Sequence, residues 1–306
     1  MFAGLRLFQG AGATRLGVIA VAGALMVAGC GDDDSSDSAT DSPSEETTAA
    51  ESVSPPAELV NDGEFTVCTD PSYPPLESFD ENGEYIGFDI DTAKAVAEIW
   101  GVEPVFQETS FSGILPALDS GRCDVAWSGL FIDPERTKTF SAVPLQETAS
   151  VIMVPAGNPG DISSPEDLAG KTVTSQTGSN LLRLAQQISD DNEANGLEAS
   201  NVQGYDKFND AIQQVASGRA DAAITQDIDV AAREQQQPGV FEIAYTFPDA
   251  ETFGVYYKPD NPELGEKLYD ALSELEKSGQ LQEFAEASAM PAEGIAVDKP
   301  IEAKEG

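Results

Sequence analysis

Few residues of this chain could do covalent or metal chemistry. The 306 residues include three cysteines, Cys30, Cys68 and Cys123, and no histidine. Ser-His-Asp and Cys-His nucleophile pairs and His-ligated metal sites are therefore excluded. The run of three aspartates that begins at Asp32 could hold calcium, but nothing in the sequence fixes six or more oxygens around one ion. We therefore expect no catalytic residue, no metal site and no cofactor, and the odd number of cysteines needs a separate explanation.

The charge balance excludes further classes of function. The chain has 54 Asp and Glu against 16 Lys and Arg, a formal net charge of −38. Affinity for nucleic-acid phosphates comes from clustered Lys and Arg, so we expect no nucleic-acid partner. Hydrophobic residues make up 41% and aromatic residues 8%, which is ordinary for a globular core. The length allows one or two domains at roughly 150 residues each.

The first thirty residues have the pattern of an export signal. Arg6 lies in a segment without acids, an apolar run covers residues 16–27, and two small residues precede Cys30. The apolar run is short for a membrane-spanning helix, which needs about 20 residues. Residues 27–30, Val-Ala-Gly-Cys, resemble the bacterial lipobox, in which the cysteine thiol receives a diacylglyceryl group. We expect 1–29 to be a signal peptide and Cys30 to be lipidated; the alternatives are a plain cleaved signal and an uncleaved anchor.

The segment after Cys30 is acidic and polar. Residues 31–64 contain no aromatic and no basic residue. Such a segment cannot bury enough apolar surface to offset its ordering entropy. The sequence therefore predicts a disordered acidic tether over 30–62, which spans roughly 30 Å as a flexible chain.

From Phe65 onward, short apolar runs alternate with amphipathic stretches, which predicts an α/β fold. Residues 65–69 form an expected strand, and Asn82-Gly83 is typical of a hairpin turn. Residues 91–100 have the apolar spacing of a helix that ends at Gly101. Ser164, followed by proline and two acidic residues, predicts a helix N-cap.

This part of the chain contains an internal repeat. Residues 111–126 align with 208–223 at an offset of 97; both begin with Phe and share Ser-Gly-Arg, Asp and Ala. Each copy predicts a helix that stops at a glycine and continues into a strand. Two similar lobes would explain the repeat, although two ordinary helix–strand units could also match by chance.

The second lobe is expected to be an insertion in the first. Two continuous apolar strands, 151–154 and 253–257, bracket the second copy, and residues 262–288 read as two helices separated at Ser278-Gly279. We therefore assign 63–151 and 253–290 to lobe 1, 152–252 to lobe 2, and 291–306 to a tail. Two lobes joined by a double strand leave a cleft at the strand ends, where open sheets place ligands.

Several motifs then occur in a recognisable order. They are Thr69–Pro75, Gly87-Phe-Asp-Ile-Asp91, Gly113–Leu118, Ser128–Arg136 and Ser163–Thr172. Over residues 65–284 the sequence resembles family 3 of the extracellular solute-binding proteins, which serve amino-acid ABC importers. The resemblance implies the two-lobe, type II periplasmic-binding-protein-like α/β fold, with lobes joined by two crossing strands. It also implies a monomer on the extracytoplasmic face of the cell membrane, a free amino acid as ligand, and ABC permease subunits as partners.

The resemblance assigns the ligand-binding residues. A buried ligand carboxylate needs a bidentate cation and backbone amides, and a buried ammonium needs a carboxylate. Arg136 matches the carboxylate clamp, and its planar fork suits that task better than lysine. The other matched positions are Ser128 and the backbone of Phe131 at the polar end, Tyr73 and Phe111 around the ligand, and the loop residues Gly178, Ser179 and Asn180. Thr92 and Phe131 depart from the family pattern, and Phe131 removes a hydroxyl from the site.

Two residues compete for the ammonium. Strict spacing points to Gln226, whereas the following residues and the charge favour Asp227. We prefer Asp227 because only a carboxylate carries the needed charge. The ligand itself stays open: the family favours a polar amino acid, whereas Phe131 and Trp127 favour a more apolar one, and a relative such as an opine is a further possibility.

The same resemblance bears on the other cysteines and on rival functions. In this fold the strands of Cys68 and Cys123 are neighbours, and an exported protein meets oxidising conditions, so we expect a disulfide rather than two buried thiols.

Cyclohexadienyl dehydratases share the fold, and their chemistry would have to use acids such as Asp70, Glu77 or Asp227. A ligand sensor that signals to a membrane kinase is the third class. The acidic surface fits solubility or adaptation to high salt.

Overall fold

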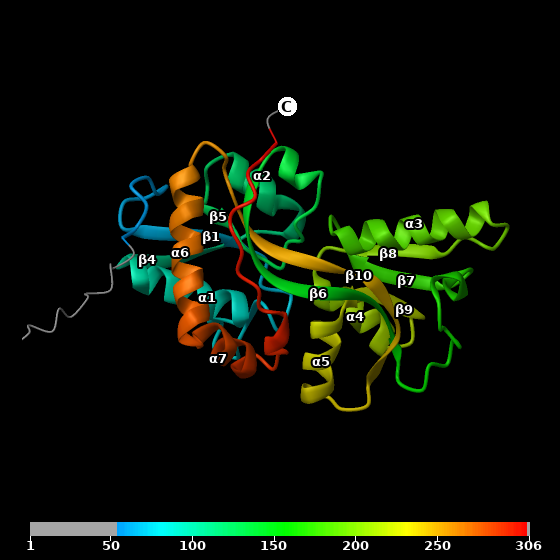
Figure 1. Cartoon of the computed structure of the whole chain (residues 1–306). Coiled ribbons are helices and arrows are strands. Elements are labelled where there is room, and N and C mark those ends of the chain that lie inside the picture. The colour runs from blue at the N-terminus through cyan, green and yellow to red at the C-terminus, as the bar shows by residue number, and fades with distance from the viewer. Residues whose placement is uncertain (1–53, 305–306) are drawn as a thin grey trace, which may run out of the picture. The chain divides into compact units, whose positions relative to one another are not determined.

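The computed structural model describes residues 54–304, in which an eight-stranded sheet is the central element (Figure 1). Its strand order is β4-β1-β5-β10-β6-β9-β7-β8. The bounds of these strands are β1 Glu64–Thr69, β4 Glu103–Glu108, β5 Val125–Ala126, β6 Ser141–Pro155, β7 Thr172–Gln176, β8 Asn201–Tyr205, β9 Ala222–Gln226 and β10 Phe241–Tyr257. The predicted signal peptide and Cys30 lie outside the described residues.

Lobe 1 is built around β1, which pairs in parallel with β4 and β5. Helices α1 (Phe88–Trp100), α6 (Pro262–Ser278) and α7 (Gln280–Ala287) pack together, and α2 (Ile114–Asp119) packs against β1 and β5. A short hairpin of β2 (Ser78–Phe79) and β3 (Tyr85–Ile86) precedes α1, as Asn82-Gly83 predicted. The expected helix end is confirmed as well, because Gly101 caps α1 in the left-handed conformation.

Lobe 2 repeats this plan with β7, which pairs in parallel with β8 and β9. Its helices are α3 (Asn180–Ala194), α4 (Phe208–Ala216) and α5 (Asp227–Gln236). The internal repeat is confirmed: α2 leads to β5 and α4 leads to β9. Gly121 and Gly218 follow these helices with φ of 71° and 70°, a conformation that suits glycine. The predicted N-cap at Ser164 is confirmed by a capping box with Asp167, at the start of the short 3-10 helix Pro165–Leu168.

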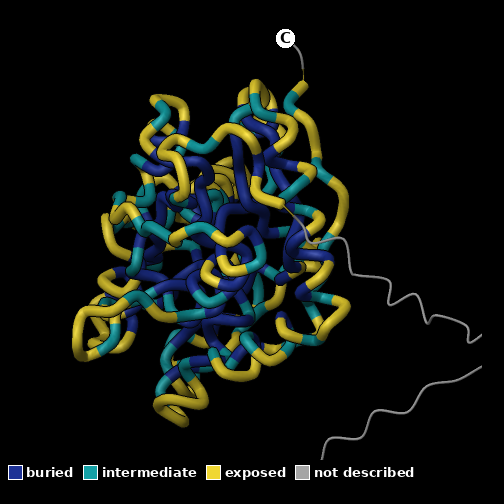
Figure 2. Tube along the Cα trace, turned by 90° about the vertical axis from the view of Figure 1, so that its left-hand side faces the viewer, coloured by how far each residue is buried: buried dark blue, intermediate teal, exposed yellow. Residues whose placement is uncertain are grey.

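Two long antiparallel strands connect the lobes. β6 and β10 pair from Ser141 opposite Tyr257 to Pro155 opposite Phe241. At one end β10 adjoins β5 of lobe 1, and at the other β6 adjoins β9 of lobe 2. This arrangement confirms the two-lobe fold with crossing strands. Strands of both lobes contain buried residues, and Figure 2 shows buried segments of the chain inside a layer of exposed loops.

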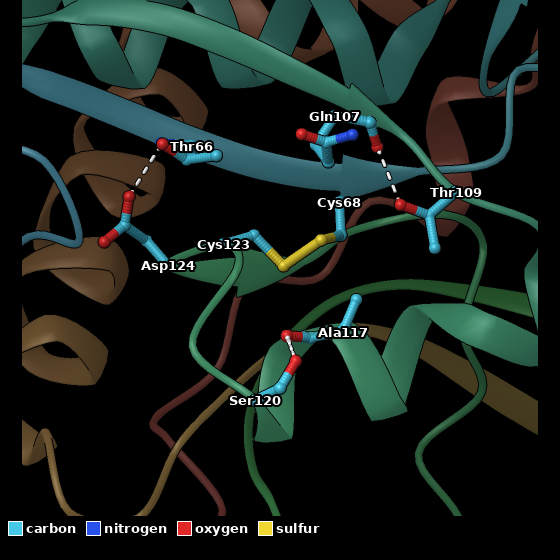
Figure 3. The surroundings of a disulfide bond; sticks show 8 residues. All are labelled: Thr66, Cys68, Gln107, Thr109, Ala117, Ser120, Cys123 and Asp124. Atoms are coloured by element: carbon cyan, nitrogen blue, oxygen red, sulfur yellow. Dashed lines mark hydrogen bonds between the residues drawn. A yellow bond between two sulfur atoms is a disulfide. The ribbon is translucent and has the colours of Figure 1, made fainter.

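The Cys68–Cys123 disulfide is present and joins β1 to the segment that leads into β5 (Figure 3). The two Cα atoms are 5.7 Å apart. Next to it, the Asp124 carboxylate accepts hydrogen bonds from the backbone N–H of Thr66 at 2.7 Å and of Val60 at 2.6 Å. The disulfide prediction is therefore confirmed. The Asp124 carboxylate also holds the start of lobe 1, next to the disulfide.

The ends of the described chain are held more closely than the sequence predicts. The tether was expected to run to residue 62, but Val60 already bonds to Asp124, and the carbonyl of Glu58 accepts from the Asn261 side chain at 3.0 Å. The tail contains a 3-10 turn at Ala292–Gly294 and then follows the edge of β6 (Figure 1). Ile301 and Ala142 exchange backbone hydrogen bonds of 2.8 and 3.0 Å. These contacts join segments that are far apart in the sequence, through side-chain-to-backbone hydrogen bonds at residues 58–60 and through backbone pairing in the tail, and sequence periodicity does not reveal them.

Candidate functional site

A pocket lies between the lobes beside the crossing strands. Its lining residues are Tyr73, Phe111, Gly129, Phe131, Arg136, Gln176, Ser179, Asn180, Leu181, Phe208 and Gln226. Its free volume is about 10 Å³, roughly the space that one water molecule needs. A larger ligand therefore enters only when side chains or whole lobes move apart.

Arg136 is the charged residue of this lining. Its side chain is 9% exposed, and its Nη1 donates to the carbonyl oxygen of Phe131 at 2.8 Å. That carbonyl also accepts from the Tyr256 hydroxyl at 2.6 Å. The Asp133 carboxylate lies 3.5 Å from Arg136 Nε. Burial lowers the pKa of Arg136, and the nearby Tyr256 and Asp133 oppose that shift. An arginine guanidinium keeps its positive charge in proteins.

Aromatic rings form the walls of the pocket. The rings of Tyr73 and Phe208, from opposite lobes, have centroids 4.3 Å apart. The Arg136 guanidinium carbon lies 5.9 Å from the centroid of the Phe111 ring. Gly129 permits the position of Tyr73, because a Cβ at Gly129 would lie 2.8 Å from the Tyr73 ring. The pocket thus combines one cation with apolar walls, the usual composition of a small-molecule site.

Polar side chains join the lobes around the pocket. Asn180 Nδ2 donates to Asp133 Oδ2 at 2.8 Å, and Gln176 Nε2 donates to Asp70 Oδ2 at 2.9 Å. The Tyr73 hydroxyl donates to Gln226 Oε1. Ser179 has a local role as well, because its Oγ caps α3 by accepting from Leu182 N at 3.0 Å. The lobes are therefore linked by direct hydrogen bonds between their own side chains.

The structure brings together only part of the predicted set. Tyr73, Phe111, Phe131, Arg136, Ser179 and Asn180 line the pocket, whereas Ser128, Gly178 and Asp227 do not. Ser128 is fully buried, donates to Glu77 Oε1 at 2.7 Å and accepts from Asp70 N at 3.0 Å. Gly178 lies beside Ser112 of lobe 1, since a Cβ there would be 3.1 Å from the Ser112 Cβ.

The preference for Asp227 over Gln226 does not match the observed positions. Asp227 Oδ1 accepts from Thr148 Oγ1 at 2.7 Å and from Ala149 N at 3.2 Å, so its carboxylate is turned toward the crossing strand β6. Gln226 is 1% exposed and lines the pocket. The physical reason is that Gln226 ends β9 and Asp227 begins α5, so the two neighbouring side chains leave in different directions.

Sequence reasoning missed Gly129, Gln176, Leu181 and Phe208. Phe208 had a usable signal, because it opens the second copy of the repeat as Phe111 opens the first. Gln176 ends β7, a parallel strand, and the carboxyl ends of such strands face the cleft. Gly129 and Leu181 carry no comparable signal.

A pair of buried acids lies behind the pocket. Glu77 accepts from Ser128, and Asp89 accepts from the backbone N–H of Gly129 at 3.1 Å, so both hold the segment that brings Gly129 to the pocket lining. Burial, followed by the neighbouring Asp89, raises the pKa of Glu77 well above its usual value. Burial also raises the pKa of Asp89 to about 6. Both shifts favour the protonated form of the carboxyl group.

Residues 54–304 contain neither a cluster of metal ligands nor a membrane-spanning helix. In that range no three or more His, Cys, Asp or Glu side chains gather as metal ligands do. No helix in the same range has the length and apolarity to span a membrane.

Comparison with known proteins agrees with this fold. The sequence model of the bacterial extracellular solute-binding proteins, family 3, matches residues 65–287. The L-cystine-binding protein TcyJ of Escherichia coli strain K12 is 28% identical over 228 residues, which cover 73% of this chain and 82% of TcyJ. The arginine-binding extracellular protein ArtP of Bacillus subtilis strain 168 is 31% identical over 225 residues, which cover 71% of this chain and 82% of ArtP.

Solved structures give the same result. An ancestral arginine-binding protein bound to arginine superimposes with a TM-score of 0.67 at 36% identity, over 74% of this chain and 97% of that one. The ancestral amino acid-binding protein AncCDT-1, a precursor of cyclohexadienyl dehydratase, has a TM-score of 0.65 at 32% identity, over 74% and 95% of the two chains. With its two lobes, crossing strands and interlobe pocket, the chain belongs to family 3 of the bacterial extracellular solute-binding proteins.

Proposed function

We propose that this protein captures a free amino acid outside the cytoplasm and delivers it to an ABC transporter. The observation that carries the proposal is the buried Arg136 guanidinium in an aromatic pocket between two lobes. The names of the relatives support it, because TcyJ binds L-cystine and ArtP binds arginine.

In the proposed capture, the ligand carboxylate bonds to Arg136. A carboxylate accepts two parallel bonds from a guanidinium, a charge-assisted geometry stronger than the single bond from Nη1 to the Phe131 carbonyl. The rings of Tyr73, Phe111 and Phe208 then enclose the body of the ligand. Because the free volume is only about 10 Å³, the lobes must open for entry and close afterwards.

A ligand screen tests this function. Thermal shift with each of the twenty amino acids should identify at least one that raises the melting temperature, since a ligand at 100 times its Kd adds about 2.7 kcal/mol of stability. Isothermal titration then gives the affinity. Turnover of prephenate or arogenate, with no amino acid bound, would instead support a dehydratase.

The proposal includes lipid anchoring at Cys30, which lies outside the described residues. The Val-Ala-Gly-Cys sequence at 27–30 motivates it. Cys30→Ser should release the protein into the soluble fraction of cells that retain the parent chain in membranes. Equal membrane retention of both proteins would refute the anchor without affecting ligand capture.

A further inference from the structure

Gln226 brings a neutral amide from lobe 2 to the pocket that Arg136 lines from lobe 1. Its side chain is 1% exposed, lines the pocket and bonds to Tyr73. Among the described residues, the lining has one formally charged side chain, Arg136, and no carboxylate. An amino acid carries both a carboxylate and an ammonium, so this lining complements only one of the two charges.

The carboxylates around the pocket are engaged elsewhere. Asp227 bonds to Thr148 and Ala149, and Asp70 bonds to Gln176 and to the Phe111 N–H. Asp229 bonds to Thr225 Oγ1 at 2.9 Å and to Arg233 Nε at 2.6 Å. Asp133 bonds to Asn180 and Arg183. A buried ammonium would therefore rely on neutral acceptors, which compensate its lost hydration less well than a carboxylate does.

The chemistry of an amide differs from that of a carboxylate. A carboxylate only accepts hydrogen bonds, whereas the Gln226 side chain accepts through Oε1 and donates through Nε2. A hydroxyl on the ligand can pair with either atom, and a keto oxygen can accept from Nε2. A hydroxyl or keto group at the α-position can therefore form a hydrogen bond with the Gln226 amide. Unlike an ammonium, such a group leaves no unpaired charge in the pocket.

We infer that Gln226 is a specificity-determining residue that lets the pocket accept 2-hydroxy and 2-oxo carboxylates as well as amino acids. The inference rests on the proposed function, because it uses Arg136 as the carboxylate clamp. The ligand class is then defined by a carboxylate and a body that fits the aromatic walls, with no requirement for a positive charge at the α-position.

Matched ligand pairs test the inference on the wild-type protein. The pairs are L-phenylalanine with L-3-phenyllactate, L-leucine with L-2-hydroxy-4-methylpentanoate, and L-arginine with its 2-hydroxy analogue. Isothermal titration of the pair that binds should give Kd values within about tenfold of each other. A hydroxy acid more than about 100-fold weaker than its amino acid would overturn the inference while leaving amino-acid capture intact. If no member of any pair and no other amino acid binds the folded protein, the proposed function itself fails.

A substitution then assigns the effect to one residue. Gln226→Asp supplies the missing carboxylate, so it should increase the preference for the amino acid over its hydroxy analogue at least about 30-fold. Gln213→Asp is the matched control, because it adds the same charge to lobe 2 at an exposed position on α4, and it should leave the ratio unchanged. A loss of amino-acid binding in Asp227→Asn, with no change in Gln226→Asp, would place the ammonium at Asp227 and overturn the inference.

Discussion

Arg136 and Arg233 occupy equivalent places in the two lobes. Each guanidinium carbon lies 5.9 Å from the ring centroid of the phenylalanine that opens its copy of the repeat, Phe111 or Phe208. The arginines are 97 residues apart, as are the phenylalanines. Their partners differ: Arg233 Nε is 2.6 Å from the fully buried Asp229, whereas Arg136 Nε is 3.5 Å from Asp133. The repeat therefore carries one tightly paired arginine and one that lines the pocket.

Arg136→Ala should weaken ligand binding by roughly 30-fold to several thousand-fold. The ligand carboxylate would be buried without its cation, which costs about 2–5 kcal/mol. Arg136→Lys should recover only part of the loss, because a point charge cannot reproduce the planar fork. Titration calorimetry with the amino acid found by the screen measures both. Normal binding by a folded Arg136→Ala variant would contradict the clamp.

Arg233→Met should affect stability rather than ligand recognition. Removing Arg233 leaves the buried Asp229 without its cation, a change that costs about 3–5 kcal/mol. Burial already raises the pKa of Asp229. A raised folded-state pKa means that the protonated form is favoured, so the deficit should shrink as the pH falls toward 4. Urea unfolding at several pH values checks this; a deficit that grows on acidification would show that the Asp229–Arg233 pair is not its cause.

Asp133→Asn should favour the open arrangement of the lobes. The amide keeps an oxygen for the backbone N–H groups of Glu135 and Arg136 but presents a donor to the Asn180 Nδ2, which is also a donor. We expect about a 10- to 100-fold loss of affinity, from one charge-assisted hydrogen bond. Small-angle scattering of the protein without ligand should show a larger radius of gyration.

The reversed pair, Asp133→Asn with Asn180→Asp, provides the control for that experiment. It restores a donor opposite an acceptor, and the new carboxylate stays near Arg183, whose Nη2 is 2.8 Å from Asn180 Oδ1. The radius should return toward the wild-type value. If the single and double variants have the same radius, the Asp133–Asn180 bond does not control closure.

Asp89→Asn should flatten the pH dependence of stability. Burial raises the pKa of Asp89 to about 6, above an unfolded value of about 3.9. Its contribution to stability is therefore fully present below about pH 4 and is lost as the pH rises through 6, on the order of 3 kcal/mol in total. Asn cannot ionise and still offers an oxygen to Gly129 N.

Denaturant titrations from pH 4 to 7 measure the effect of Asp89→Asn. Glu77→Gln is the companion variant, because burial raises the Glu77 pKa too. Unchanged curves would mean that Asp89 ionises in the folded protein at no cost.

Reduction of Cys68–Cys123 should lower the free energy of unfolding by roughly 2–4 kcal/mol. The bond closes a loop over a sequence separation of 55 residues, which restricts the unfolded chain. Paired Cys68→Ser and Cys123→Ser substitutions, compared in urea with the oxidised parent, give the value. Equal urea midpoints would show that the Asp124 hydrogen bonds and the adjacent strand pairing stabilise this part of lobe 1 without the disulfide.

The sequence predicted the elements that depend on local pattern. The hairpin at Asn82-Gly83, the repeated helix–glycine–strand units and the crossing strands all follow from turn residues and apolar spacing. The disulfide followed from the family resemblance. The placement of the Gln226 and Asp227 side chains does not follow from the sequence for a physical reason: it depends on where β9 ends and α5 begins, and a shift of one residue redirects the side chain. The path of the tail along β6 was not predictable either, because it depends on pairing between distant segments.

The crossing of β6 and β10 also determines the order in which a nascent chain can complete its parts. The elements of lobe 2, from β7 to α5, are contiguous in sequence, whereas α1 must wait for α6 and α7 from the far end of the chain. Closing that long loop is slower and entropically more demanding than assembling neighbouring elements. The lobe that begins first during synthesis is therefore completed last, and the α1 surface that packs against α6 and α7 stays uncovered until those C-terminal helices are made.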